Sequence, residues 1–172
     1  MTETFEQIPR PTDPIGRVLF GCAYAFALAG GLLMTAIAIM VVVSVLGRWL
    51  FLAPIPGDFE MVAIGTAVAV FLFLPYCHLI KGNVIVDLFL SWAPAKVRTA
   101  FDMASGVLLA VIAAVLAWRM VLGGLDMHRY HEVSIILGVP LWPVFPAAVA
   151  SFALLAAACI YTSARDLKKL FE

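Results

Sequence analysis

A long segment without a single charged residue, Val18–Leu46, stands near the start of the chain. As an α-helix it would be about 43 Å long, which exceeds the roughly 30 Å hydrocarbon core of a bilayer. Its length also exceeds the apolar part of a secretion signal, and no small-residue cleavage site ends it. The segment therefore predicts a transmembrane helix that tilts or bends, with Gly30-Gly31 as the expected bending point.

Three further apolar segments follow, at residues 61–80, 103–122 and 141–162. Hydrophobic residues make up 64% of the chain and charged residues 13%, whereas soluble domains are about one quarter charged. The alternating pattern of a membrane β-barrel is absent from the sequence. We therefore expect an all-α integral membrane protein, one membrane domain over residues 1–172 with four transmembrane helices.

Several residues mark the expected helix ends. Asp58 follows Pro56-Gly57 and is a candidate N-cap of the second helix, where its charge and that of Glu60 suit the helix dipole. Pro75 predicts a kink near the end of that helix. Trp142 and Tyr161 flank the fourth span as interfacial aromatic residues.

The distribution of Lys and Arg predicts the orientation. With four spans, both termini and the second loop share one side. That side carries Arg10, Arg17, Lys81, Lys96, Arg98, Arg165, Lys168 and Lys169. The other side carries Arg48, Arg119 and Arg129. The positive-inside rule then places the tail at residues 1–14 and the C-terminus in the cytoplasm. The net charge of zero argues against a nucleic-acid partner.

The segment between the second and third spans is too short to cross and too apolar for a solvated loop. Over residues 83–92, Asn83, Asp87 and Ser91 recur every four residues and form one polar stripe. This pattern predicts a short amphipathic helix lying flat at the membrane interface. The alternative is a continuation of the second span, which the Gly82-Asn83 step argues against.

The cores of the spans contain no Asp, Glu or Lys. Carriers of ions or protons usually keep ionisable groups or broken helices at mid-membrane, so we expect neither catalysis nor transport by this chain alone. The sequence offers no cofactor-binding set. His128 and His131 are a weak metal signal, with a solvated loop as the favoured alternative. The cysteines, none in a CxxC pair, are expected to be small residues within helices.

Two other classes of protein stay open at this point. A four-helix redox protein binding haem or quinone would need paired histidines in facing spans, and only His78 lies near a span. A self-associating membrane protein is the second class, motivated by small residues four apart, a spacing that permits close packing within the chain and against another subunit equally well. These pairs are Gly65 with Ala69, Gly106 with Ala110, and Ala25 with Ala29.

Three motifs occur in a characteristic order. Gly57-Asp58-Phe59-Glu60 opens the second span, Lys81-Gly82-Asn83-Val84-Ile85-Val86-Asp87 follows it, and Pro140-Leu141-Trp142-Pro143 opens the fourth span. In this order and spacing the chain resembles the DctQ-like family, the small membrane subunits of tripartite ATP-independent periplasmic (TRAP) transporters. Many members carry His where this chain has Asn83, so a role for that histidine does not carry over.

The resemblance implies a multi-pass protein of the bacterial inner membrane without enzymatic activity. It implies two partners, a large multi-span permease subunit and a periplasmic substrate-binding protein, in sodium-coupled uptake of an organic anion such as a carboxylate. The small subunit would brace the permease and help dock the binding protein. Candidate contacts with partners or the interface are Arg48, Asp58, Glu60, Lys81, Asn83, Asp87, Arg119 and Trp142.

Overall fold

A computed structural model describes residues 13–52, 55–80 and 95–171 of the chain. Within them lie four helices: α1 (Pro14–Phe51), α2 (Asp58–Leu79), α4 (Ala95–Arg129) and α5 (Val144–Phe171). Each contains a stretch long and apolar enough to cross a membrane. The prediction of an all-α protein with four transmembrane helices is confirmed. The expected interfacial helix at residues 83–92, with Lys81, Asn83 and Asp87, lies outside the described residues.

The helices differ from the expected spans mainly at their ends. Pro14 starts α1 in the first turn, where its missing N–H costs no hydrogen bond. The prediction that Asp58 caps α2 is wrong by one residue, because the cap is Gly57 in a left-handed conformation and Asp58 is already helical. The helix α5, which was expected from residue 141, begins at Val144, so Leu141–Pro143 belong to the preceding turn.

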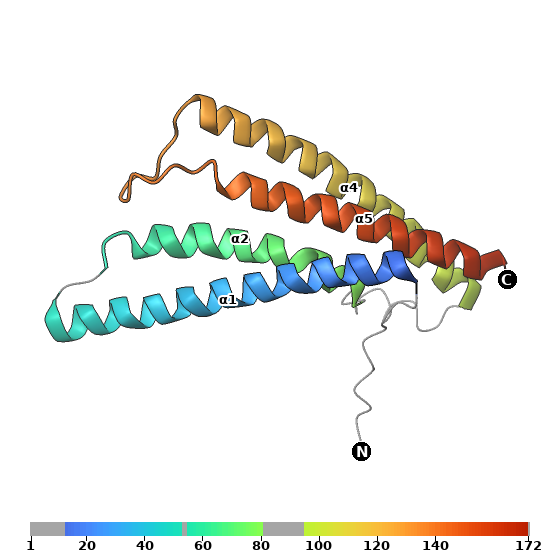
Figure 1. Cartoon of the computed structure of the whole chain (residues 1–172), viewed down its shortest axis with the longest axis horizontal. Helices are drawn as coiled ribbons and strands as arrows, with labels where there is room; N and C mark the ends of the chain where they lie inside the picture. The colour runs from blue at the N-terminus through green and yellow to red at the C-terminus, as the bar shows by residue number, and fades with distance from the viewer. Residues whose placement is uncertain (1–12, 53–54, 81–94, 172) are drawn as a thin grey trace, which may run out of the picture.

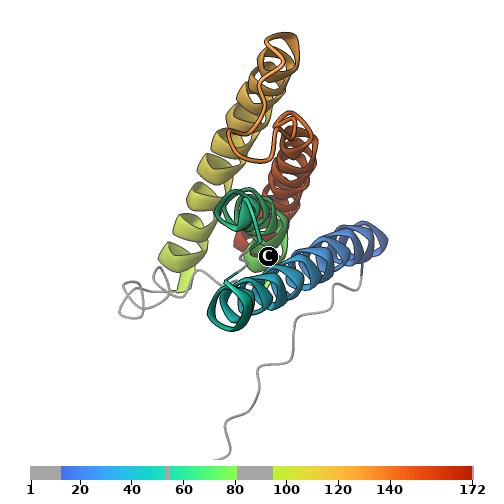
Figure 2. The same ribbon diagram turned by 90° about the vertical axis from the view of Figure 1, so that its left-hand side faces the viewer.

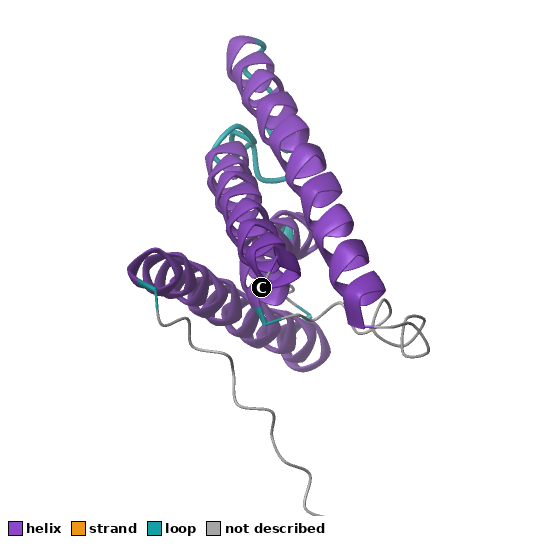
Figure 3. Cartoon of the chain, turned by 90° about the vertical axis from the view of Figure 1, so that its right-hand side faces the viewer, coloured by secondary structure: helices purple, strands orange, loops and turns teal. Residues whose placement is uncertain are grey.

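The four helices form an open row rather than a closed bundle. The chain makes two antiparallel hairpins, α1–α2 and α4–α5, and packing of α2 against α5 joins them. Figure 1 shows the order α1, α2, α5, α4 across the molecule, and Figure 2 shows the same row from its loop end. Helices and loops account for the described chain, apart from one isolated bridge between Val133 and Pro140 (Figure 3).

Little of each helix is covered by the others. Only 6% of the most apolar stretch of α1 is buried, and even in α5, which has neighbours on two sides, the share is 33%. A closed four-helix bundle would bury one face of every helix. The row therefore leaves broad apolar surfaces for lipid or for another protein.

The core lies where α5 meets α4 and α2. Ala110 and Ala113 of α4 pack with Leu155 and Cys159 of α5, and the Phe152 ring is 5.4 Å from that of Phe71 on α2. In addition, the Ser151 hydroxyl donates to the Phe71 carbonyl oxygen. Without a hydrophobic driving force between helices in lipid, such small residues allow the close van der Waals packing that holds helices together.

Glycines set the closest helix approaches. A Cβ on Gly30 of α1 would lie 3.3 Å from the Ala69 carbonyl oxygen of α2, so this glycine serves helix packing. In the same α1–α2 contact, the Ile37 side chain packs on Gly65 of α2. In the α4–α5 contact, the Ser163 side chain packs on Gly106. Small residues of two predicted pairs are thus used inside the chain, which weakens the argument from them for self-association.

Candidate functional site

Most described candidate residues meet at one end of the row, here called the loop end, formed by residues 55–60 and 130–143 together with the end of α1. The first cluster joins α1 to α2. Ser44 donates its hydroxyl to Asp58 Oδ2 at 2.6 Å, and Arg48 lies 3.5 Å from the same oxygen. The backbone N–H of Ile55 donates to Ser44 Oγ at 3.4 Å. Arg48 and Asp58 are therefore paired within the chain, on the loop side of the first hairpin.

Ser44 was missed as a site residue. It is only 1% exposed, and its hydroxyl connects the Ile55 N–H to the Asp58 carboxylate. Ser44 and Arg48 are four residues apart and so share one face of α1. That spacing, ending an otherwise apolar run, was the signal available in the sequence.

The second cluster ties the two hairpins together. Glu60, in the first turn of α2, accepts the backbone N–H of Ile136 on Oε1 at 2.9 Å and that of Leu137 on Oε2 at 3.1 Å. The loop holds its two amides in position with bonds of its own, from the Ser134 N–H to the Val139 oxygen and from the Gly138 N–H to the Ser134 oxygen. A carboxylate with one N–H on each oxygen makes strong, charge-assisted bonds. We call this contact the Glu60 clasp.

Gly57 completes the clasp by providing room for Leu137. Its φ of +76° is strained for any residue with a Cβ, and a Cβ built there would lie 2.5 Å from Leu137 Cγ. The spacing Gly57-x-x-Glu60 therefore has a physical reason. The glycine accepts the Leu137 side chain, and the glutamate accepts the backbone N–H groups of Ile136 and Leu137.

Trp142 takes part in a third, looser cluster at this end. The His128 ring lies 5.3 Å from the Trp142 ring, edge to face, and 6.3 Å from the His131 ring. His131 has a φ of +52°, unusual for a residue other than glycine. All three side chains are exposed. Within the described residues, no group of three or more His, Cys, Asp or Glu side chains is placed to hold a metal ion.

The remaining candidates do not join these clusters. Arg119 is exposed on α4 and has no hydrogen bond or ion pair to any part of the chain that the structure describes. His78 lies at the opposite end, where its Nε2 is 3.1 Å from Thr162 Oγ1. Near it, Tyr161 donates to Asp13 Oδ2 at 3.3 Å. These contacts join α1, α2 and α5 at the end of the row where α1 begins and α5 ends.

Several large apolar side chains are exposed at the loop end. Ile135 is 98% exposed at the tip of the loop, and Phe59, next to Glu60, is 84% exposed. Trp49 and Phe51 at the end of α1 are also exposed. Hydrogen bonds tie this loop to α2, and the exposed side chains beside them form an apolar surface suited to contact with another protein or with lipid.

The family model of the DctQ component of the tripartite ATP-independent periplasmic transporters matches residues 37–169. The chain belongs to this family. Searches of curated proteins and of solved structures found no match. Membership makes this chain a small membrane component of a TRAP transporter. The matched range contains both the first cluster, around Ser44 and Asp58, and the Glu60 clasp.

Proposed function

We propose that this chain is the non-catalytic subunit that braces the large permease of a sodium-coupled TRAP transporter. In this proposal the transported substrate is an organic anion such as a carboxylate, captured by a periplasmic binding protein. The chain lies in the bacterial inner membrane with both termini in the cytoplasm, which places the loop end in the periplasm. The excess of Lys and Arg on the side of the termini supports this orientation.

The observation that carries the proposal is the open row of helices. A carrier needs a pathway enclosed by protein, with polar or ionisable groups near mid-membrane. Among the described residues, the packing order α1, α2, α5, α4 encloses no such pathway, and the cores of the spans lack Asp, Glu and Lys. A row with apolar faces is suited to lie against a larger membrane protein and extend its scaffold.

The loop end supports a second part of the role, docking of the binding protein. Ile135 stands on a loop whose neighbouring amides are held by Glu60. An exposed aliphatic side chain on a rigid loop loses little conformational entropy when a partner covers it. We therefore assign the docking contact to Ile135 and Phe59.

Co-expression with a large multi-span TRAP permease tests the bracing role. The affinity-tagged chain should retain the permease through purification, and Glu60→Gln should reduce the retained amount because one N–H of the clasp loses its acceptor. Glu132→Gln is the matched control, since the exposed Glu132 side chain has no hydrogen bond or ion pair among the described residues. Equal retention by both variants would count against a role of the clasp in assembly.

Reconstitution separates bracing from docking. Liposomes holding both membrane subunits should take up substrate only with the binding protein and a sodium gradient. Ile135→Ser should lower uptake while the permease still co-purifies. Ile15→Ser, at an exposed isoleucine of the opposite end, should leave uptake unchanged. Uptake by this chain alone would overturn the proposal.

A further inference from the structure

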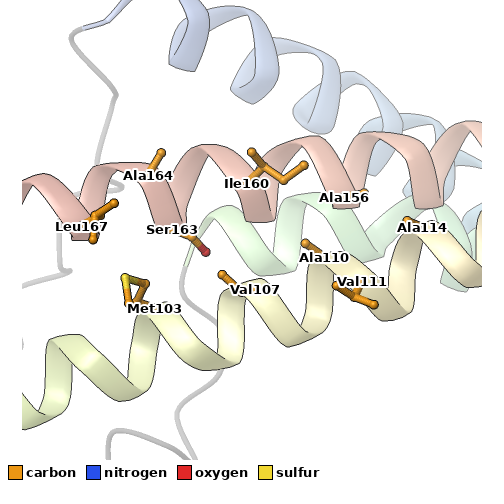
Figure 4. Close-up of a pocket in the computed structure, with 10 residues that line it drawn as sticks. All are labelled: Met103, Val107, Ala110, Val111, Ala114, Ala156, Ile160, Ser163, Ala164 and Leu167. Carbon is orange, nitrogen blue, oxygen red and sulfur yellow. The ribbon is translucent and has the colours of Figure 1, made fainter.

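An apolar groove of about 450 Å³ runs between α4 and α5, on the half of these helices next to the termini (Figure 4). On α5 its lining extends from Ala156 to Leu167, and on α4 from Met103 to Ala114. Ser163 is the one polar side chain among the ten described residues that line it. The groove lies outside the loop-end clusters, so the proposed function does not explain it.

The groove is as long as one leaflet of a bilayer is deep. Eleven residue steps along α5 correspond to about 16 Å, close to half of the roughly 30 Å hydrocarbon core. At the loop end of the two helices, Phe145 of α5 packs on Gly123 and Gly124 of α4 and fills the space between them. A transmembrane helix of a partner would need a surface across both leaflets, whereas a lipid chain needs only one.

Ser163 lies toward the end of the groove that is nearest to the C-terminus. It stands two residues before Arg165, where the apolar stretch of α5 ends. Its side chain points between the helices in Figure 4 and is 8% exposed. Within the part of the chain that the structure describes, Ser163 Oγ and Arg165 Nε both lack a hydrogen-bond partner. A buried hydroxyl without a partner is unfavourable, so an acceptor from a ligand is expected there.

We propose that this groove binds one acyl chain of an anionic phospholipid from the leaflet on the side of the termini. The chain lies along the alanine and valine side chains of the groove. The ester carbonyl accepts the Ser163 hydroxyl, and the phosphate lies toward the basic sequence formed by Arg165, Lys168 and Lys169. This inference requires only that α4 and α5 span a membrane, so it does not depend on the role in transport.

Native mass spectrometry of the delipidated chain tests the proposal with phosphatidylglycerol and phosphatidylcholine of identical chains. We expect one tightly retained phosphatidylglycerol and weaker retention of phosphatidylcholine. Ala164→Phe, an exposed alanine on the groove, should weaken binding about tenfold, equal to the loss of roughly ten close atom pairs. Ala150→Phe, an exposed alanine of α5 outside the groove, is the matched control and should bind normally.

Equal binding by the two variants, or no retained phospholipid in the parent chain, would overturn the proposal. Equal retention of the two lipids would overturn the assignment of the phosphate to the basic end. A second measurement tests the proposal even if Ala164→Phe fails to fold. A photoreactive benzoylphenylalanine in place of Ile160, which lines the groove, should form a lipid adduct in native membranes, and a polypeptide adduct instead would show that a protein covers the groove.

Discussion

Replacing Gly57 by alanine should open the contact between the two hairpins at the loop end. The new Cβ would lie 2.5 Å from Cγ, 2.7 Å from Cδ2 and 3.1 Å from Cδ1 of Leu137. The whole end of that side chain must therefore move. Because the N–H of Leu137 is bonded to Glu60, displacement of the side chain also disturbs the clasp.

The expected cost has two parts. An alanine at a φ of +76° costs about 1 kcal/mol relative to glycine. Overpacking against Leu137 adds about 1–3 kcal/mol, the usual range for excess atoms in a packed contact. We expect Gly57→Ala to lower the free energy of unfolding by about 2–4 kcal/mol in total.

Gly138→Ala is the matched control. Gly138 also has a positive φ, +63°, but a Cβ there meets nothing within 4 Å. It should therefore cost only the conformational part, about 1 kcal/mol. Leu137→Ala removes the atoms that collide, so combining it with Gly57→Ala should recover most of the steric part.

Unfolding of the purified chain by SDS in mixed micelles, followed by circular dichroism, measures these free energies. We expect Gly57→Ala to lower the free energy of unfolding clearly more than Gly138→Ala does. We also expect the double variant Gly57→Ala/Leu137→Ala to lose less than the sum of the two single variants. Equal costs for the two glycine variants, or strictly additive effects in the double variant, would refute the packing of Leu137 on Gly57.

Three further substitutions test other contacts by the same unfolding measurement. Glu60→Gln should lower the denaturation midpoint, because the amide nitrogen of Gln cannot accept an N–H, whereas Glu132→Gln should not. Ser44→Ala should lower the free energy of unfolding by about 1 kcal/mol, the net value of a buried hydrogen bond, and an unchanged value would show that water replaces the hydroxyl. Gly30→Val should cost about 1–3 kcal/mol through overpacking against Ala69, and a neutral result would mean that α1 and α2 separate freely.

The helices themselves were predictable because a charge-free run such as Val18–Leu46 has few alternatives in a membrane. Their ends were less so. The helix α1 extends beyond the predicted apolar run at both ends, to Pro14 and to Phe51, because helical hydrogen bonding continues past the charge-free residues. Asp58 was expected to cap α2, but Gly57 occupies that position. Glycine adopts the left-handed conformation of this cap without steric cost, so the helix starts one residue later, at Asp58.

The arrangement of the site was harder to predict. The sequence marked Arg48, Asp58 and Glu60 as outer-end charges, and two of these pair with each other. Glu60 instead meets backbone amides of Ile136 and Leu137, and amides carry no signal in the sequence. The order α1, α2, α5, α4 was likewise hidden, because hydropathy shows that a helix enters lipid but not which helix lies beside it.

The Glu60 clasp has a consequence for the timing of synthesis. Glu60 and Leu137 are 77 residues apart, so the glutamate leaves the ribosome well before the loop that it binds. At a synthesis rate of about 5–20 residues per second, roughly 4–15 s pass between the addition of Glu60 and that of Leu137. During that interval the Glu60 carboxylate lacks the two backbone N–H groups that it binds in the folded chain, and Gly57 lacks its contact with the Leu137 side chain. The order of synthesis therefore makes this contact between the two hairpins one of the last to form.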